Sequence, residues 1–266
     1  MSTSIDPRAA VSPKAQIGEN VTIGPFAVVE DGAVIGDGTT VAPHALIATG
    51  ARIAKNCIIH HGAIVGHTPQ DLKYAGEITT CEVGEGTTVR EYATLHRGTG
   101  EGGRTIIGKK CFLMGYVHIA HDCIVGDNVI MSNAAMLAGH TEVEDNVIIG
   151  GVTPVHQFTR IGRHSMVGGG LRVVKDVPPY SLAGGAPLVC EGLNAIGLRR
   201  RGFSRETLDA LDKAYTTLYR AKLNVSQAVE AITADPALMA VPEVQHLVTF
   251  IKGSKRGIIG APRLHS

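Results

Sequence analysis

The sequence has no tryptophan, and aromatic residues make up only 4% of its 266 positions. A core packed from large rings is therefore excluded, even though 44% of the residues are hydrophobic. The formal net charge is +1, so the chain also lacks the overall basic field that favours nucleic-acid binding. These deficits favour a core of small aliphatic side chains, chiefly valine, isoleucine and alanine.

Long apolar runs are missing as well. No run reaches the roughly 20 residues that a transmembrane helix needs, so we expect no membrane span. Residues 1–7 lack the basic and apolar regions of a signal peptide. Together these absences favour a cytoplasmic protein.

The five cysteines are scattered singly along the chain. Zinc ligation through cysteine normally uses closely paired positions, and that spacing is absent. Cys57, Cys81, Cys111 and Cys123 occupy positions at which other parts of the chain carry small residues. We therefore expect these thiols to be buried as small core side chains.

What the sequence does contain is a six-residue repeat. From Ile5 to Val173, every sixth residue is aliphatic, and the exceptions Asp71, Glu77 and Glu101 lie in segments that we expect to form loops. A helix with 3.6 residues per turn cannot keep this spacing on one face, whereas short strands separated by turns can. We predict an all-β prism in which three hexads form each 18-residue coil. The aliphatic column points into this prism.

Two interruptions divide the repeat, at about residues 67–81 and 97–105. Because the register survives both, we expect these loops to project from coils that remain stacked. Loops that project from a rigid scaffold often carry function.

The repeat fades after Val173, and prolines and glycines between residues 178 and 187 indicate a change of structure. We predict three helices beyond this point. Ser204 caps the first, the second covers about residues 226–233, and the third starts near Pro242. The expected organisation is a β-helix domain over residues 1–190 and a C-terminal helical region over residues 191–266.

Coil stacking brings separate polar residues to one edge of the prism. Gly139 follows His121 by one 18-residue coil and should lie about 4.8 Å above it, with Gln157 one coil further. The other polar members of this edge are His118, Asp122, His140 and His156. The edge therefore combines several imidazoles, a carboxylate and a backbone N–H.

Three interpretations of this edge remain open from the residues alone. The histidines can be solvated or structurally satisfied corner residues. They can bind zinc, which requires ligands that converge at about 2.0–2.1 Å. One of them can act as a general base on a hydroxyl group, with backbone N–H groups stabilising the oxyanion that forms.

Six strings occur in a fixed order along the chain: QDLKYAGE, HIAHDC, LAGH, VHQF, DVPPY and RRRGFSRE. With them, nearly the whole chain resembles the UDP-N-acetylglucosamine O-acyltransferase family. The resemblance implies a left-handed parallel β-helix, a hand that is exceptional for parallel strand connections. It also implies a homotrimer whose acyl groove lies between subunits, and an enzyme that needs no metal or cofactor.

The reaction implied by the resemblance is the first step of lipid A and lipopolysaccharide biosynthesis. A 3-hydroxyacyl group passes from acyl carrier protein to the 3-hydroxyl of UDP-N-acetylglucosamine. His121 matches the catalytic base, Asp122 matches the carboxylate that orients it, and Gly139 matches the N–H that stabilises the oxyanion. The matching substrate positions are Gln70, Asp71, Lys73, His118, His140, His156 and Gln157, and the matching nucleotide positions are Asn194, Arg200 and Arg201.

Gly169 matches the position that limits acyl-chain length in the family. It lies 48 residues beyond His121, or roughly 13 Å along the axis at about 4.8 Å per coil. Because glycine leaves room there, we expect an acyl group longer than ten carbons. A tight turn over residues 168–170 is the alternative explanation for this glycine.

The basic residues suit an acidic acyl carrier protein, although they can equally form a solvated surface. The candidates are Arg160, Arg163, Arg172, Lys175 and Arg205, and the basic run over residues 199–201 suits the same partner. Ile196 stands where the family commonly has glutamate, so the resemblance does not extend to this nucleotide contact. A 3-amino sugar nucleotide is accordingly an alternative acceptor.

Three other functions stay open. The later N-acyltransferase of the same pathway has an additional N-terminal domain, whereas the hexads here begin at Ile5. A zinc-dependent hydratase of the carbonic anhydrase type uses the same fold. A non-catalytic scaffold would tolerate the replacement of His121.

Overall fold

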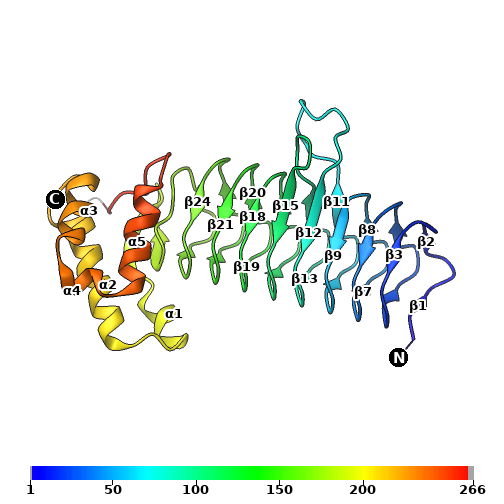
Figure 1. Cartoon of the computed structure of the whole chain (residues 1–266), viewed down its shortest axis with the longest axis horizontal. Coiled ribbons are helices and arrows are strands. Elements are labelled where there is room, and N and C mark those ends of the chain that lie inside the picture. The colour runs from blue at the N-terminus through cyan, green and yellow to red at the C-terminus, as the bar shows by residue number, and fades with distance from the viewer. Residues whose placement is uncertain (1, 263–266) are drawn as a thin grey trace.

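The computed structural model describes residues 2–262, which form an elongated prism with helices at its C-terminal end (Figure 1). Short parallel strands stack into three sheets of eleven, eight and eight strands, here called sheets A, B and C. Successive strands pass from A to B to C, so three strands complete one coil. The predicted parallel β-helix is confirmed.

The strands of sheet A are β1 (Ser4–Ile5), β4 (Thr22–Ile23), β7 (Thr40–Val41), β10 (Ile58–Ile59), β13 (Thr88–Val89), β16 (Phe112–Leu113), β19 (Ile130–Met131), β22 (Ile148–Ile149), β25 (Met166–Val167), β26 (Ser181–Gly184) and β27 (Val189–Leu193). Those of sheet B are β2 (Ala10–Val11), β5 (Val28–Val29), β8 (Leu46–Ile47), β11 (Ile64–His67), β14 (Thr94–His96), β17 (His118–Ile119), β20 (Met136–Leu137) and β23 (Pro154–Val155). Sheet C contains β3 (Gln16–Ile17), β6 (Val34–Ile35), β9 (Ala51–Ile53), β12 (Thr80–Val83), β15 (Arg104–Ile107), β18 (Ile124–Val125), β21 (Glu142–Val143) and β24 (Arg160–Ile161).

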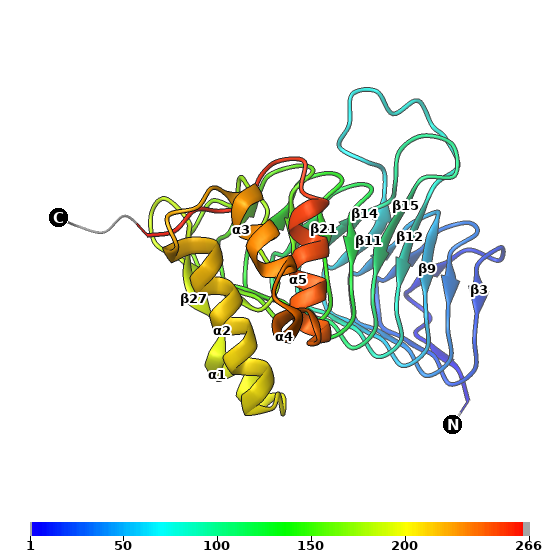
Figure 2. The same ribbon diagram turned by 60° about the vertical axis from the view of Figure 1, so that its left-hand side comes forward.

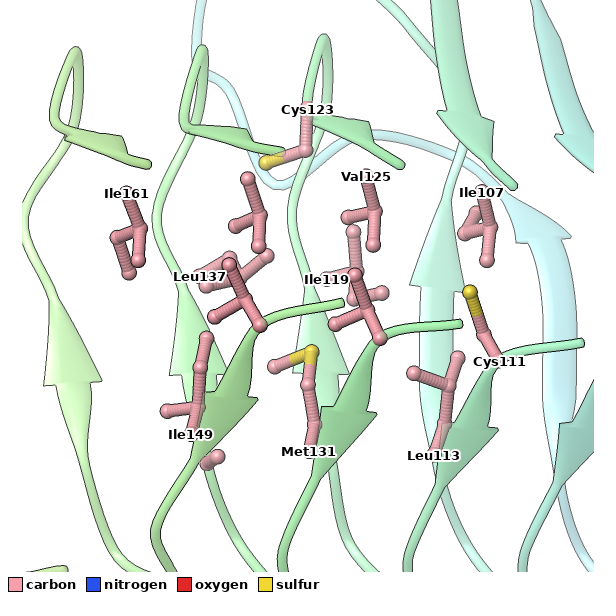
Figure 3. Close-up of a cluster of buried hydrophobic side chains, with 14 of the residues drawn as sticks. Ile107, Cys111, Leu113, Ile119, Cys123, Val125, Met131, Leu137, Ile149 and Ile161 are labelled. Carbon is pink, nitrogen blue, oxygen red and sulfur yellow. The ribbon is translucent and has the colours of Figure 1, made fainter. Parts of the chain in front are cut away.

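The aliphatic column fills the interior, as the repeat predicts. Ile119 pairs with Leu137, and Leu137 pairs with Val155, so equivalent residues are one coil apart. Figure 3 shows side chains from all three sheets pointing into the same space. Ile5 departs from the pattern: its side chain is 44% exposed because it belongs to the first coil, which no coil covers from below.

Each coil turns at three corners, called A–B, B–C and C–A after the sheets that they join. A residue with positive φ makes the turn, for example Tyr116 at corner A–B (62°), Asp122 at corner B–C (58°) and Asn128 at corner C–A (56°). This left-handed conformation is uncommon outside glycine. The backbone turn therefore sets the position and direction of the Cα–Cβ bond at each corner, whichever residue is there.

The two interruptions both project from corner B–C, as residues 68–79 and 97–103. Figures 1 and 2 show them side by side above the prism. Val65 pairs with Leu95, five hexads further along the chain, and Leu95 pairs with Ile119, four hexads further. An uninterrupted coil has three hexads, so the first insertion adds two hexads and the second adds one. Because each insertion is a whole number of hexads, the six-residue register continues through both.

The C-terminal region begins with a hairpin that extends sheet A, in which β26 pairs parallel with β25 and antiparallel with β27. The expected boundary at residues 190/191 falls inside β27. Five helices follow: α1 (Ala195–Arg200), α2 (Arg205–Arg220), α3 (Val225–Thr233), α4 (Pro236–Met239) and α5 (Pro242–Lys252). The three predicted helices are α2, α3 and α5, and the Ser204 side chain caps α2 by accepting from the Thr207 N–H.

The buried core is continuous from the prism into the helices, which cover its last coils (Figure 2). Cys57, Cys81, Cys111 and Cys123 are buried free thiols, as expected, and so is Cys190. Desolvation raises the pKa of Cys111 to about 11, so this thiol stays neutral. None of the helices in residues 2–262 is both long and apolar enough to cross a membrane.

Candidate active site

His121 and Asp122 form a hydrogen-bonded pair at corner B–C, directly after β17. His121 Nδ1 lies 2.8 Å from Asp122 Oδ2, and each side chain is 14% exposed. An ionised carboxylate only accepts, so Nδ1 carries the hydrogen and donates it. The lone pair of the neutral imidazole is therefore on Nε2, which is the arrangement of a general base.

Asp122 has a second set of partners on the loop 97–103. The Thr99 hydroxyl donates to Oδ2 at 2.6 Å, and the Thr99 N–H donates to Oδ1 at 3.0 Å. The Asp122 N–H donates in turn to Thr105 Oγ1 at 2.9 Å. Burial by itself would raise the pKa of Asp122, but the hydrogen bonds from Thr99 and His121 hold it below its usual value.

Gly139 lies directly over the His121 ring, which confirms the stacking prediction. A Cβ atom placed on Gly139 would lie 2.5 Å from His121 Cε1 and 2.7 Å from Nε2. Such distances leave no room for a side chain. Within residues 2–262 the Gly139 N–H has no hydrogen-bond acceptor, so it is free to bind an oxyanion beside the imidazole.

His140 is the second imidazole at this edge. Its ring lies edge-on to His121 at 5.3 Å and stacks on Phe158 at 4.7 Å. His140 Nε2 is 3.8 Å from Asp122 Oδ2. His121, Asp122 and His140 bring one ligand atom each to within 4.8 Å of one another, so the described residues include a group that can hold a metal ion. This group offers two imidazoles and a carboxylate.

His118 lies on β17, shortly before the dyad, and its Nδ1 is 2.7 Å from Thr94 Oγ1. Burial and the nearby His121 lower the pKa of His118. Burial and the neighbouring His118 also lower the pKa of His96 to about 4. These two imidazoles are therefore neutral near pH 7 and available as hydrogen-bonding groups.

The loop 68–79 brings residues over the dyad. Asp71 Oδ2 lies 4.0 Å from His121 Nε2, the nitrogen that Asp122 leaves free. Gln70 lines a cavity beside His121, whereas the Lys73 side chain is exposed. The cavity has a volume of about 360 Å³. Its other lining residues are His118, Ala120, His121, Met136, Leu137, Ala138, Gly139, Pro154, Val155 and Gln157.

Gln157 lines this cavity, whereas His156 does not. His156 Nδ1 lies 3.0 Å from the carbonyl oxygen of Gln157. This contact leaves Nε2 as the ring nitrogen that can reach a substrate.

Three predicted nucleotide residues lie elsewhere, near corner C–A. Asn194 caps α1 by accepting from the Gly197 N–H, and it donates to the His164 carbonyl at 3.0 Å. Arg201 donates to Asn146 Oδ1, and Arg200 is exposed. Sheet C separates this corner from the dyad, so one chain does not bring these residues to His121.

Gly169 is also at a different corner from the dyad. It follows β25, and Val173 beyond it pairs with Val155 of sheet B, so Gly169 turns corner A–B. The axial estimate of its position omitted this rotation, because the offset between Gly169 and His121 is not a whole number of coils. Gly169 and His121 therefore flank the two edges of sheet B.

Sequence reasoning missed Thr99. Stacking arithmetic works only for residues within the hexads, and Thr99 belongs to an insertion. One feature of the sequence could have indicated Thr99. The Gly-rich insertion that contains it projects from the corner that carries His121.

Comparisons with known proteins show which chains are similar to this one. A family model described as Udp N-acetylglucosamine O-acyltransferase, Domain 2, matches residues 176–259, and a hexapeptide-repeat transferase model matches residues 14–49 and 104–139. An acyl-[acyl-carrier-protein]–UDP-N-acetylglucosamine O-acyltransferase of Burkholderia orbicola is 52% identical over 97% of this chain and 99% of its own.

Two solved structures are also similar. The UDP-N-acetylglucosamine acyltransferase of Bacteroides fragilis has a TM-score of 0.93 at 43% identity, covering 96% of this chain and 99% of that one. The corresponding protein of Francisella novicida has a TM-score of 0.94 at 35% identity, covering 97% and 95%. The similarity includes both the prism and the C-terminal helices, and it supports the left-handed β-helix.

Proposed function

This chain belongs to the UDP-N-acetylglucosamine O-acyltransferase family, and from that premise we propose a function for it. It is an acyltransferase that moves a 3-hydroxyacyl group from acyl carrier protein to the 3-hydroxyl of UDP-N-acetylglucosamine, in the first step of lipid A biosynthesis. One observation carries the proposal. A base oriented by a carboxylate lies beside a free backbone N–H, in a cavity that Gln70 of the loop 68–79 also lines.

The proposed chemistry follows from the two nitrogens of His121. Nδ1 is held by Asp122, so Nε2 takes the proton from the sugar 3-hydroxyl. The hydroxyl oxygen then attacks the thioester carbonyl, whose oxygen becomes an oxyanion beside the Gly139 N–H. When the intermediate collapses, the ester remains on the sugar. The carrier thiolate leaves and receives the proton from His121.

We propose that the active enzyme is a homotrimer. Asn194, Arg200 and Arg201 are too far around the prism to reach the dyad of their own chain, but a neighbouring chain can supply them. An exposed aromatic stripe along corner A–B supports subunit contact. It contains Phe26, His44, His61, Tyr92 and Tyr116, whose successive rings lie 5.1–5.4 Å apart. Exposed patches of this kind are typical of interfaces.

The acyl chain is proposed to lie along the outer face of sheet B. Met136, Ala138 and Pro154 give this part of the cavity an apolar surface. The path leads from His121 at one edge of the sheet toward Gly169 at the other. Because Gly169 has no side chain to end the path, we propose a donor longer than ten carbons.

Arg172 and Lys175 are the best candidates for docking acyl carrier protein, because both are exposed. The other three candidate cations are engaged within the chain. Arg160 pairs with Glu142 and stacks on Phe250, while Arg163 pairs with Glu144 and Arg205 with Asp209. A cytoplasmic location is part of the same proposal.

Ile196 is 62% exposed on α1, so the family's usual carboxylate is missing from the surface of this region. A 3-amino sugar nucleotide therefore remains the second candidate acceptor. In that case the same dyad would deliver an amide, and the product mass would distinguish the two reactions.

The test is mass spectrometry of reactions that contain UDP-N-acetylglucosamine and 3-hydroxyacyl carrier proteins of several chain lengths. The natural protein should form an acylated nucleotide sugar and favour donors longer than ten carbons. A folded His121→Ala variant should be slower by about 10²–10⁴-fold, the usual contribution of a general base.

Three results would change the proposal. Equal rates for both proteins would show that His121 is not the base. A preference for the ten-carbon donor would show that Gly169 does not leave room for a longer acyl chain. No product from the natural protein would overturn the acceptor. The amino-sugar nucleotide would then be tried, followed by metal analysis of the protein for the zinc alternative.

A further inference from the structure

We propose that Thr99 is a positioning residue that holds the catalytic dyad from the loop 97–103. The proposal rests on the acyl-transfer function given above, and it assigns this loop a role in the chemistry. Thr99 does not touch the cavity itself, since it is not among the residues that line it. It acts on the reaction through Asp122.

Thr99 and His121 share one carboxylate oxygen. Asp122 Oδ2 accepts from the Thr99 hydroxyl at 2.6 Å and from His121 Nδ1 at 2.8 Å, while Oδ1 accepts from the Thr99 N–H at 3.0 Å. Donors on both oxygens prevent the carboxylate from rotating about its terminal bond. The imidazole is therefore aimed by a carboxylate that Thr99 has already fixed.

The loop is built to keep Thr99 in that place. A Cβ on Gly103 would overlap the Thr99 carbonyl, and a Cβ on Gly98 would overlap the backbone of Gly103 and Arg104. The Gly98 N–H also donates to the Thr80 carbonyl at 3.2 Å, which ties the loop to β12. Glycine on each side thus lets the backbone close tightly around one residue with a hydroxyl.

The shared oxygen has a consequence for the base. A hydroxyl that donates to Oδ2 draws carboxylate charge away from the bond to His121. Without that hydroxyl, more of the charge acts on the imidazole, and protonated His121 becomes more stable. The acid limb of the kcat/KM profile, which follows the base in the free enzyme, should then move to higher pH.

Arg97 provides a contrast within the same segment, because it holds the other loop. Its guanidinium donates to Tyr74 Oη at 2.8 Å, to the Thr49 carbonyl at 2.8 Å and to the Gly66 carbonyl at 3.2 Å. Tyr74 follows Asp71 closely, on the loop that covers the dyad. Loss of Arg97 should therefore weaken acceptor binding and leave the basicity of His121 unchanged.

The experiment compares Thr99→Val, Thr99→Ser and Arg97→Gln in the full-length protein, with UDP-N-acetylglucosamine and one acyl carrier protein donor. Valine keeps the shape and the backbone N–H of Thr99 but removes the hydroxyl. We expect Thr99→Val to lower kcat by about tenfold and to leave the acceptor KM within about twofold of its natural value. The acid limb of its kcat/KM profile should rise by about half a pH unit. Thr99→Ser should restore both properties, whereas Arg97→Gln should raise the acceptor KM with an unshifted limb.

A double-mutant cycle with Asp122→Asn separates positioning from folding. If Thr99 acts through Asp122, then Thr99→Val should have little further effect in the Asp122→Asn protein. An unshifted acid limb in Thr99→Val, a serine variant as poor as the valine variant, or the same tenfold loss in both backgrounds would each overturn the proposal. Inactivity of the natural protein toward this acceptor would instead refute the proposed function.

Discussion

Corners A–B and B–C are made by the same backbone turn but carry different chemistry. Tyr116 and Asp122 both adopt positive φ, at 62° and 58°. Gly115 and Gly139 hold the same place in their turns. Gly115 precedes Tyr116, and Gly139 precedes His140, which also has positive φ at 58°. Within residues 2–262 neither glycine N–H has a hydrogen-bond acceptor. At other corners the N–H at this place donates to a carboxylate, as Thr49 does to Glu30 and Lys109 to Asp127. The hexad therefore leaves this N–H without a backbone acceptor, and what it binds depends on what surrounds it.

The surroundings differ because both insertions occur at corner B–C. They bring Asp71 to 4.0 Å from His121 and the Thr99 hydroxyl to 2.6 Å from Asp122. Corner A–B has no insertion in the described residues, and its rings follow one another in a stripe, some stacked and some edge-on. Interrupting the repeat at one corner made a recessed polar site. Leaving the other uninterrupted kept a straight aromatic surface, which we propose as the contact with another copy.

The sharpest way to test this contrast is to add one methyl group at each corner. In Gly139→Ala the new Cβ would lie 2.5 Å from the His121 ring, so the ring must move. A displacement of about 1 Å in a catalytic group can cost about 10²-fold in rate, and we expect a loss of that size. Initial rates of acyl transfer at saturating substrates would measure it.

Gly115→Ala is the matched control at corner A–B. Its new Cβ would meet Asn133 Nδ2 at 3.2 Å and Glu91 O at 3.5 Å, which need only small adjustments. We expect activity within about twofold of the natural protein. Equal losses in the two variants would show that the turn, and not the contact with His121, sets the effect.

A second change tests the aromatic stripe. Tyr92 and Tyr116 are 46% and 62% exposed and stack at 5.4 Å, so replacing both by serine should leave the single chain folded. If the stripe joins subunits, the substitutions should weaken the trimer by about tenfold or more in concentration at half-dissociation, because buried aromatic residues dominate interfaces. Sedimentation over a range of protein concentrations would measure this shift.

Ile124→Ser is the control for that experiment. Ile124 is also exposed, by 49%, but it lies on sheet C, away from the stripe. It should sediment as the natural protein does. If the Ile124 variant dissociates and the tyrosine variant does not, sheet C and not corner A–B forms the contact.

The same division separates what the sequence could predict from what it could not. Stacking by one coil placed Gly139 over His121 correctly, because both lie within the hexads. Asp71 was identified only through family resemblance and Thr99 was missed, since an inserted loop has no fixed relation to the coil below it. The helices α1 and α4 were also missed, because each is too short to show an apolar period.

Near neutral pH the smallest expected effect is on the free energy of unfolding, through His96 at the base of corner B–C. Burial and the nearby His118 lower the pKa of His96 to about 4, from 6.5 in the unfolded chain. Between about pH 4 and pH 6.5, His96 is therefore protonated in the unfolded state and neutral in the folded state. This group's full contribution to stability is present above about pH 6.5, and it is lost as the pH falls from there toward 4. By linkage the loss is about 1 kcal/mol near pH 6 and about 3 kcal/mol near pH 4.

Urea unfolding midpoints at pH 7.5, 6.5 and 5.5 would measure this slope, and His96→Gln would isolate the part due to His96. Glutamine does not titrate, so the variant should lose less stability than the natural protein on acidification. Other groups contribute equally to both proteins, among them His164 at corner C–A, whose pKa burial also lowers to about 4. Identical slopes would mean that His96 gains a proton in the folded state as easily as in the unfolded one. Burial would then not lower the pKa of His96, and this side chain would be partly protonated near pH 7 instead of fully neutral.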